Sequence, residues 1–160
     1  LAEGKFNAFD PRTRHKSGPH IKRGYMDVSD NVVFETQLET LKCFNRKEES
    51  HPWRGAWPVN SSLGYQVWFP KLYPNNDWKN EISNDFDVIT EEYIGTESNK
   101  NLYPESHVPI RYVFAHYKNI FGITVYKFLG EFHSSREESG PRRVVYRLKA
   151  RRIKLPKATT

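Results

Sequence analysis

The sequence predicts an α+β domain in which a twisted mixed or antiparallel sheet closes toward a barrel, with one or two helices packed on it. Aromatic and β-branched residues alternate with polar residues over three long stretches, at about 110–117, 122–133 and 142–154. This alternation is typical of half-buried strands. Turn-forming residues separate the stretches, so we expect a meander of antiparallel strands. At 160 residues the chain fits one domain with a single core.

The remaining elements are expected to precede this meander. Between residues 30 and 46, apolar residues recur at intervals of three to five positions behind a capping residue, which predicts a helix. Residues 65–69 and 87–94 have the composition of strands, and residues 78–82 are expected to form a short helical turn. Residues 1–24 contain Gly and Pro with little periodicity, which indicates an irregular arm.

We treat residues 1–160 as one nucleic-acid-binding domain. Because the chain starts without Met, we expect it to be a piece of a larger protein. No stretch approaches the roughly 20 apolar residues of a membrane helix, and the first residues lack the apolar core of a signal peptide, so no membrane partner is expected. The lone Cys43 excludes an internal disulfide and favours the reducing cytoplasm.

Charge is distributed unevenly along the chain, whose net charge is +6. Residues 25–109 carry seven Lys or Arg against fourteen acidic residues, whereas residues 142–160 carry eight against none. A strand at 142–154 would place Val144, Tyr146 and Leu148 inward and a row of cations outward. Such a row favours contact with phosphates. We therefore predict phosphate binding by five residues: Arg143, Arg147, Lys149, Arg151 and Arg152.

Tryptophans lie among Pro, Asn and Asp between residues 51 and 78, and this composition favours a pocket for a planar base. Aromatic faces can stack on any base, and neighbouring amides and carboxylates can bind its hydrogen-bonding edge. Tryptophans beside prolines also cap small cores, and Pro74-Asn75-Asn76-Asp77 is a strong turn sequence, so both ordinary structural roles stay open. The predicted base-pocket residues are Trp53, Trp57, Trp68, Tyr73, Asn76, Asp77 and Trp78.

Catalytic and metal-binding patterns are weak in this sequence. His107, His116 and His133 lack the helical i, i+4 spacing of metal ligands, so we expect neither metal nor cofactor. Nucleophilic triads and phosphate-binding Gly-rich loops are also absent. The cluster Asp85, Asp87 and Glu91 leaves a metal-dependent nuclease as an alternative, although no Asp-x-Lys or Glu-x-Lys follows at short range.

The last 50 residues resemble the PUA-like superfamily, whose SRA and EVE domains read modified bases in restriction and defence proteins. The resemblance rests on the strand sequences at Val113–Lys118, Tyr126–Phe132 and Val145–Ile153. It implies a small PUA-like barrel with a concave pocket that accepts one flipped base between aromatic rings. No family pocket residue maps onto positions before 100.

Taken together, these patterns predict a DNA-binding recognition module that reads a modified base, with a cytosine derivative as the favoured ligand. It would be the targeting domain of a restriction or defence protein, with a fused or partner nuclease or helicase domain. A binding domain is favoured over an independent enzyme. An RNA-binding module is an alternative function, because aromatic basic sheets also bind RNA. A protein-interaction domain, whose basic strand would bind an acidic partner, is a further alternative.

Overall fold

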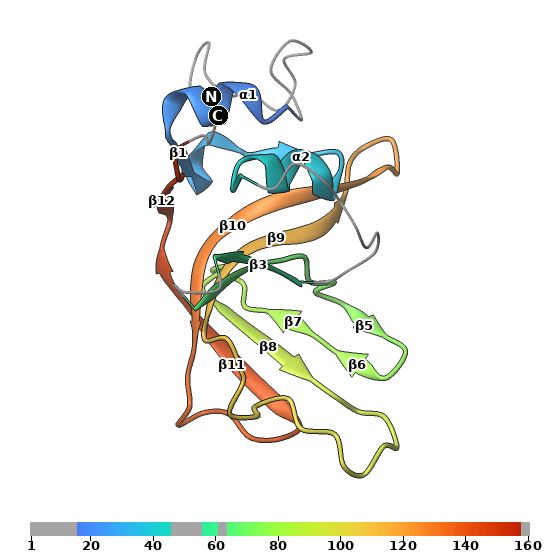
Figure 1. Ribbon diagram of the computed structural model, residues 1–160. Coiled ribbons are helices and arrows are strands. Elements are labelled where there is room, and N and C mark those ends of the chain that lie inside the picture. Colours follow the sequence, from blue (N-terminus) through green and yellow to red (C-terminus); the bar gives the residue numbers. More distant parts are fainter. Residues whose placement is uncertain (1–15, 46–55, 61–63, 158–160) are drawn as a thin grey trace.

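The computed structural model describes residues 16–45, 56–60 and 64–157 of the chain, and of residues 58–60 only the backbone. Strands dominate this part of the chain, and two short helices lie together at one end (Figure 1). The helices are α1 (Gly18–Arg23) and α2 (Gln37–Lys42), with a 3-10 turn η1 (Val28–Asp30) between them. The strands are β1 (Tyr25–Asp27), β2 (Val33–Phe34), β3 (Ala56–Asn60), β4 (Tyr65–Trp68), β5 (Pro74–Asn75), β6 (Trp78–Lys79), β7 (Glu81–Ile82), β8 (Val88–Glu92), β9 (Ile110–Lys118), β10 (Thr124–Ser134), β11 (Arg143–Ala150) and β12 (Arg152–Lys154).

The main sheet is mixed and eight-stranded, with the order β3-β4-β9-β10-β11-β8-β7 and with β2 paired to β10. β9, β10 and β11 form the predicted antiparallel meander, and β4 runs parallel to β9. Within the described residues the pairing runs as an open path from β3 to β7, so the predicted closure into a barrel is not confirmed.

The central strand β10 is irregular at Gly130. Its register against β9 shifts between Phe128 and Gly130, and its register against β11 shifts between Glu131 and Phe132. Gly130 has a φ of 117°, a backbone conformation that residues with a side chain rarely adopt. Bulges of this kind bend a strand and increase its twist. β10 curves strongly along its length in Figure 1.

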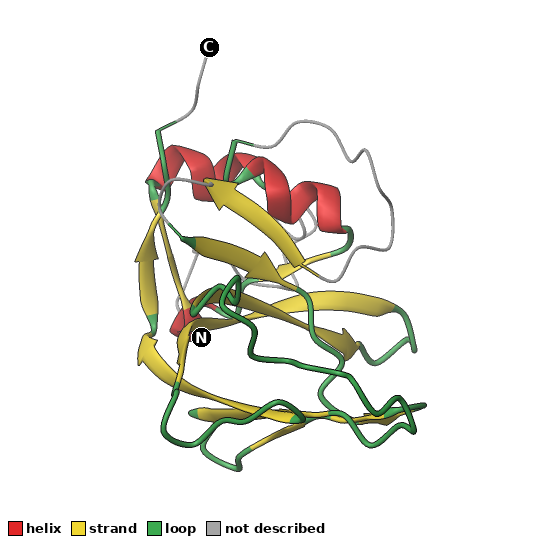
Figure 2. Ribbon diagram, turned by 60° about the horizontal axis from the view of Figure 1, so that its bottom comes forward, coloured by secondary structure: helices red, strands yellow, loops and turns green. Residues whose placement is uncertain are grey.

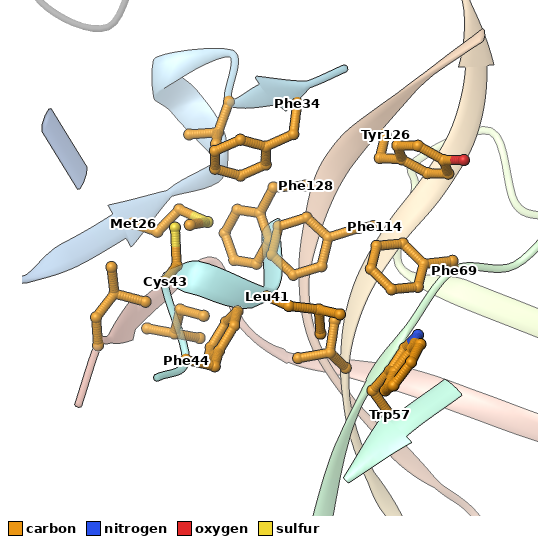
Figure 3. Close-up of a cluster of buried hydrophobic side chains, with 14 residues drawn as sticks. Met26, Phe34, Leu41, Cys43, Phe44, Trp57, Phe69, Phe114, Tyr126 and Phe128 are labelled. Atoms are coloured by element: carbon orange, nitrogen blue, oxygen red, sulfur yellow. The ribbon is translucent and has the colours of Figure 1, made fainter. Parts of the chain in front are cut away.

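Two hydrophobic clusters form the core. In the first, Leu41 and Phe44 from α2 and the residues after it pack with Phe114 of β9 and Phe128 of β10 (Figure 3). In the second, Trp68 packs with side chains that include Ile89, Phe132, Val144 and Tyr146. Figures 1 and 2 show both helices together at one end of the strands, and the labels in Figure 1 place this end away from β7 and β8. Because strand side chains alternate between faces, Val67 lies in the first cluster and Trp68 in the second.

The helix predicted at 30–46 is wrong in its first half. Asn31 adopts a left-handed conformation, and Val33 and Phe34 pair with Lys127 and Tyr126 of β10. The helix begins only after Thr36, whose side-chain oxygen accepts a hydrogen bond from the Glu39 N–H at 3.0 Å. Strand pairing has therefore overridden the helical periodicity of this segment.

Two further expectations need correction. The helical turn predicted at 78–82 is absent, because Trp78–Lys79 pairs with β5 and Glu81–Ile82 pairs with β8. Residues 18–23, within the segment expected to be an irregular arm, form helix α1. The strands predicted at 65–69 and 87–94 are confirmed as β4 and β8, each slightly shorter than expected.

Candidate functional site

A cavity of about 570 Å³ opens between the β5–β6 hairpin and the neighbouring ends of β9 and β10. β4, β8, β9 and β10 belong to the main sheet, and the start of α2 adds Gln37 to the lining. Ligand sites in proteins commonly have this size and combine aromatic walls with a few polar groups. The aromatic residues of the lining are Trp68, Phe69, Tyr73, Trp78 and Tyr126. The polar and charged ones are Gln37, Lys71, Asn75, Asn80, Glu91, His116, Lys118 and Thr124.

Two tryptophans of the lining contact other side chains of the protein. The Trp68 ring lies 4.8 Å from that of Tyr146, and the Arg111 guanidinium lies 4.7 Å from the Trp68 ring. Trp78 meets Tyr93 edge to face at 5.4 Å, with the Lys100 ammonium 5.5 Å from the Trp78 ring. Trp78, which is partly exposed, is thereby pre-positioned as a surface for stacking a flat ligand, whereas Trp68 is 5% exposed and belongs to the second core cluster.

Glu91 is the acidic residue of the cavity lining. It is largely surrounded by protein, and burial raises the pKa of its carboxyl, opposed in part by the nearby charge of Arg111 and by a hydrogen bond from Tyr146. That bond joins the Tyr146 hydroxyl to Glu91 Oε1 at 3.3 Å. A carboxyl in this state can accept a hydrogen bond when ionised and donate one when protonated.

Two other polar groups of the lining have defined states. Asn80 is 8% exposed, and its side-chain oxygen accepts a hydrogen bond from the Glu92 N–H at 3.2 Å, which fixes the orientation of its amide. Burial lowers the pKa of His116, and the charge of Lys71 adds to the effect. His116 is therefore a neutral imidazole at physiological pH. Together with Glu91, the cavity offers both donors and acceptors to the edge of a ligand.

The five predicted aromatic pocket residues divide into three groups. Trp68, Tyr73 and Trp78 line the cavity. Trp57 does not, because it is fully buried in the first core cluster, where its indole N–H donates to Gln37 Oε1 at 3.2 Å (Figure 3). Trp53 lies outside the described residues.

The predicted edge readers Asn76 and Asp77 form the two-residue turn between β5 and β6 and are exposed. Asn76 has a φ of 52°, and the Asp77 carbonyl accepts a hydrogen bond from the Ile94 N–H at 2.7 Å. The turn interpretation of this sequence therefore describes the structure better than the base-edge interpretation. The adjacent Asn75 lines the cavity in their place.

The cations of β11 are exposed, and Arg147 lies on the opposite face of β8 and β11 from Glu91. Across the β8–β11 ladder, Glu91 pairs with Val144 and Val88 pairs with Arg147. Because side chains alternate along a strand, Glu91 and Val144 point to one face and Arg147 to the other. The lysines that line the cavity are instead Lys71 and Lys118.

Two of the five predicted phosphate ligands have acidic partners. Arg147 forms a two-pronged ion pair with Glu138, with Nε donating to Oε2 at 2.7 Å. Arg152 donates from Nε to Asp27 Oδ2 at 3.0 Å. Among the described residues, Arg143, Lys149 and Arg151 form no such pair within 4 Å, and all three are exposed.

The carboxylates of the nuclease alternative do not converge. Asp87 Oδ1 accepts a hydrogen bond from the Ser83 hydroxyl at 2.7 Å, Asp85 is exposed in the turn before it, and Glu91 lies in the cavity. In the part of the chain that the structure describes, no three His, Cys, Asp or Glu residues are grouped so as to hold a metal ion. None of the described helices is long and apolar enough to cross a membrane.

Most of the polar lining carries no sequence signal for a base pocket. The sequence pattern marks Glu91 only as a candidate metal ligand and His116 only as an inward residue of its strand. Asn75, Asn80, Lys71 and Lys118 have no distinguishing signal, because the pocket is assembled from β5–β6, β8, β9 and β10. Asn75 alone stands within one residue of a predicted site.

The sequence model of the SRA domain, "SET and RING associated domain", matches residues 20–155, so the chain belongs to this family. This membership confirms the predicted resemblance and the predicted class, a DNA-binding domain of the modified-base-reading kind. Among solved structures, the fold is similar to "The 5-Hydroxymethylcytosine-Specific Restriction Enzyme AbaSI", with a TM-score of 0.83 and 25% sequence identity. The similarity covers 94% of this chain but about half, 49%, of the AbaSI chain. No curated protein sequence matches the chain.

Proposed function

We propose that this chain is the targeting domain of a restriction enzyme, which binds duplex DNA and holds one modified base, turned out of the helix, in the cavity beside the β9–β10 hairpin. The observation that carries the proposal is the cavity itself, in which Trp68, Tyr73 and Trp78 accompany Glu91 and Asn80. A base cannot be enclosed by rings and read along its edge while it is stacked in a duplex.

The polar groups favour a cytosine derivative as the ligand. Cytosine presents an amino group at N4, and carboxylates are the usual acceptors for that group. Glu91 is the acidic residue that lines the cavity, and we assign it to this edge. The amide of Asn80 and the neutral imidazole of His116 are available to the remaining polar atoms of the base and its substituent.

5-Hydroxymethylcytosine is the first modification to test, because the similar structure is that of an enzyme specific for it. A hydroxymethyl group adds a donor and acceptor that a methyl group lacks. A pocket that hydrogen-bonds this hydroxyl would discriminate strongly against the methyl analogue, since its own polar groups would then be left unpaired.

We propose that Lys71 and Lys118 contact the phosphates beside the turned-out base, and that the exposed cations Arg143, Lys149 and Arg151 contribute further sequence-independent contacts. The cleavage activity would reside in a fused or partner nuclease domain, and a helicase domain is the other partner considered, because the similarity reaches only half of the AbaSI chain. The domain would act in the cytoplasm, where the lone Cys43 is kept reduced.

The test is a binding titration against matched duplexes that carry cytosine, 5-methylcytosine, 5-hydroxymethylcytosine or 6-methyladenine, at two salt concentrations. We expect a preference of about tenfold or more for one modified cytosine, or about 1.4 kcal/mol. Equal affinity for all four duplexes would contradict the proposal.

Two further experiments test the alternative functions, RNA binding and nuclease activity. RNA of the same sequence, used as a competitor, should displace the modified duplex poorly; efficient displacement would favour an RNA-binding module. Incubation of plasmid DNA with the chain and Mg²⁺ or Mn²⁺ tests for independent nuclease activity. Cleavage that an Asp87→Ala substitution abolishes would return the carboxylate cluster to consideration.

A further inference from the structure

Arg111 of β9 lies next to the cavity without lining it. Its guanidinium lies 4.7 Å from the Trp68 ring and 5.1 Å from the Tyr146 ring, and its Nε donates to the Val108 carbonyl at 3.4 Å. Among the described residues, no carboxylate lies within 4 Å of the guanidinium. Because a guanidinium stays protonated at any working pH, Arg111 places a permanent positive charge beside the cavity.

This charge acts on the carboxyl of Glu91. Tyr146 connects the two groups, since its ring contacts Arg111 and its hydroxyl donates to Glu91 Oε1 at 3.3 Å. Burial raises the pKa of Glu91, and the charge of Arg111 is the strongest influence that opposes burial, ahead of the Tyr146 hydrogen bond and the charge of Lys100. Arg111 is therefore the group that does most to keep this carboxyl ionised.

The other titratable groups nearby do not take over this role. Burial raises the pKa of the Tyr146 hydroxyl, so it stays a neutral donor. Burial lowers the pKa of His116 in the cavity lining, and it lowers the pKa of His107, whose ring lies 6.1 Å from that of Tyr146, to about 4. Both imidazoles are therefore neutral at physiological pH. Lys71 and Lys118 line the cavity, but their charges are not among those that change the pKa of the carboxyl.

The ionisation state of Glu91 decides which base edge it can bind. An ionised carboxyl only accepts hydrogen bonds, whereas a protonated carboxyl also donates one. Cytosine presents an amino donor at N4, and thymine or uracil presents an acceptor, O4, at the same position. The same side chain would therefore favour cytosine derivatives when ionised and would also bind uracil derivatives when protonated.

We propose that Arg111 is a positioning residue that keeps Glu91 an ionised acceptor, so that the cavity selects a modified cytosine over the uracil with the same substituent. This inference rests on the proposed function, because it concerns the edge of a base that enters the cavity. A charge outside the cavity achieves this selection without taking space that the base needs.

The test measures affinity for two duplexes over a series of pH values. One duplex carries the preferred modified cytosine opposite guanine, and the other carries the corresponding uracil opposite adenine; for 5-hydroxymethylcytosine this is 5-hydroxymethyluracil. The energy needed to turn out each base is a property of the DNA, so it cancels when variants are compared at one pH. We expect the unsubstituted chain to lose its preference for the cytosine as the pH falls and Glu91 is protonated. With Arg111→Met this loss should occur about one pH unit higher, because a nearby opposite charge lowers the pKa of a carboxyl by about this amount or more.

Further variants separate the charge of Arg111 from its shape. Arg111→Lys keeps the charge and should keep the pH profile of the unsubstituted chain, whereas the neutral Arg111→Gln should behave as Arg111→Met does. Arg136→Met is the matched control: Arg136 also lies over an aromatic ring, that of Tyr103 at 5.0 Å, but its charge is not among those that change the pKa of Glu91. In a Glu91→Gln background, whose amide does not titrate, adding Arg111→Met should change the preference by less than about twofold.

The outcomes are distinguishable. If a modified cytosine is preferred but both neutral variants keep the pH profile of the unsubstituted chain, the role of Arg111 is overturned and the base-reading function stands. The role is also overturned if Arg111→Lys loses the preference as Arg111→Met does, or if the loss persists in the Glu91→Gln background, because Arg111 would then act through packing. If the unsubstituted chain prefers no modified cytosine at any pH, the proposed function and this inference fail together. Thermal unfolding confirms that folded variants are compared, and Arg111→Gln decides the question if Arg111→Met does not fold.

Discussion

The hydroxyl of Tyr146 donates a hydrogen bond to Oε1 of Glu91, linking a fully buried core ring to the carboxyl that lines the cavity. The same Tyr146 ring supports Trp68 at 4.8 Å. Arg111 lies 5.1 Å from the Tyr146 ring and 4.7 Å from the Trp68 ring. Tyr146 therefore positions both the aromatic ring of Trp68 and the carboxyl of Glu91 in the cavity lining. We expect that Tyr146→Phe would disturb recognition through Glu91 while leaving the packing of Trp68 largely intact.

The carboxyl of Glu91 should make stability depend on pH. Burial raises its pKa in the folded state, so the folded chain holds this proton more tightly than the unfolded chain does. The contribution of Glu91 to the free energy of unfolding is fully present below the pKa of its carboxyl in the unfolded chain, about 4.5. This contribution is lost as the pH rises through the higher pKa of the carboxyl in the folded chain. Glu91→Gln removes this loss. The free energy of unfolding of Glu91→Gln, relative to the unsubstituted chain, should therefore increase between about pH 4.5 and pH 8.

Denaturant unfolding of both chains across this pH range measures the difference. Glu92→Gln is the control, because Glu92 is the next residue of β8 and points to the other face of the sheet. A Glu91→Gln difference that does not vary with pH would contradict the assignment of a raised pKa.

Trp78→Ala should abolish the preference for the modified duplex while leaving affinity for unmodified DNA within about threefold. The substitution removes a ring from the cavity wall, and one aromatic–base contact is worth roughly 1–3 kcal/mol. The measurement is the same titration series, repeated with this variant. Its counterpart is Trp57→Ala, which we expect to lower the free energy of unfolding by about 3–5 kcal/mol, because Trp57 is fully buried in the core. Equal loss of affinity for all duplexes with Trp78→Ala would assign the ring to general DNA contact.

Two groups of cations are candidates for phosphate contact, those that line the cavity and those along β11, and their contributions to DNA binding should differ. Lys118 lines the cavity, whereas Lys149 lies in β11. We expect Lys118→Ala to weaken binding to every duplex and to reduce the salt slope by about one. Lys149→Ala should have a smaller effect. Affinity measured over a series of salt concentrations checks both, and a larger effect of Lys149→Ala would place the duplex against the cations of β11 rather than at the cavity.

The ion pair of Arg147 gives a second means of testing whether the cations of β11 contact DNA. The hydrogen bonds from Arg147 hold the pKa of Glu138 at about 2, so this carboxylate is ionised at any working pH. Glu138→Gln would leave the Arg147 charge uncompensated. If the cations of β11 contact phosphates, this variant should bind all duplexes more tightly and with a steeper salt dependence. Unchanged affinity would remove Arg147 from the interface.

The sequence predicted the strands of this fold well and its helices poorly. The meander from residue 110 to 150 combines strict alternation with clear turns, so local pattern and final structure agree there. The third strand, predicted at 142–154, breaks at Arg151, and its last part, β12, pairs with β1 in a separate sheet. The helix predicted at 30–46 failed in its first half because Val33 and Phe34 pair with a strand more than 90 residues away. Periodicity within a short segment carries no information about such a partner.

The same reason limits prediction of the site. Trp68, Tyr73 and Trp78 could be identified because their residue type and neighbours favour stacking. Trp57 has similar neighbours, yet it lies in the core, because β3 pairs with β4 and its indole N–H finds a buried partner in Gln37. Glu91 and His116 enter the cavity only through the order of strands in the sheet, which the sequence did not determine.

Gly130 should be essential to the curvature of β10. A Cβ atom at this position would lie 2.6 Å from Leu148 Cδ1 and 2.7 Å from the carbonyl oxygen of Ala150, and the φ of 117° is unfavourable for other residues. We expect Gly130→Ala to lower the free energy of unfolding by about 2–4 kcal/mol, from backbone strain and overpacking together. Gly24→Ala is the matched control: Gly24 also has a positive φ, but a Cβ added there would meet no described atom within 4 Å. That variant should lose only about 1–2 kcal/mol. Denaturant unfolding measures both losses, and equal losses would show that the close approach of β11 to Gly130 does not contribute to the cost.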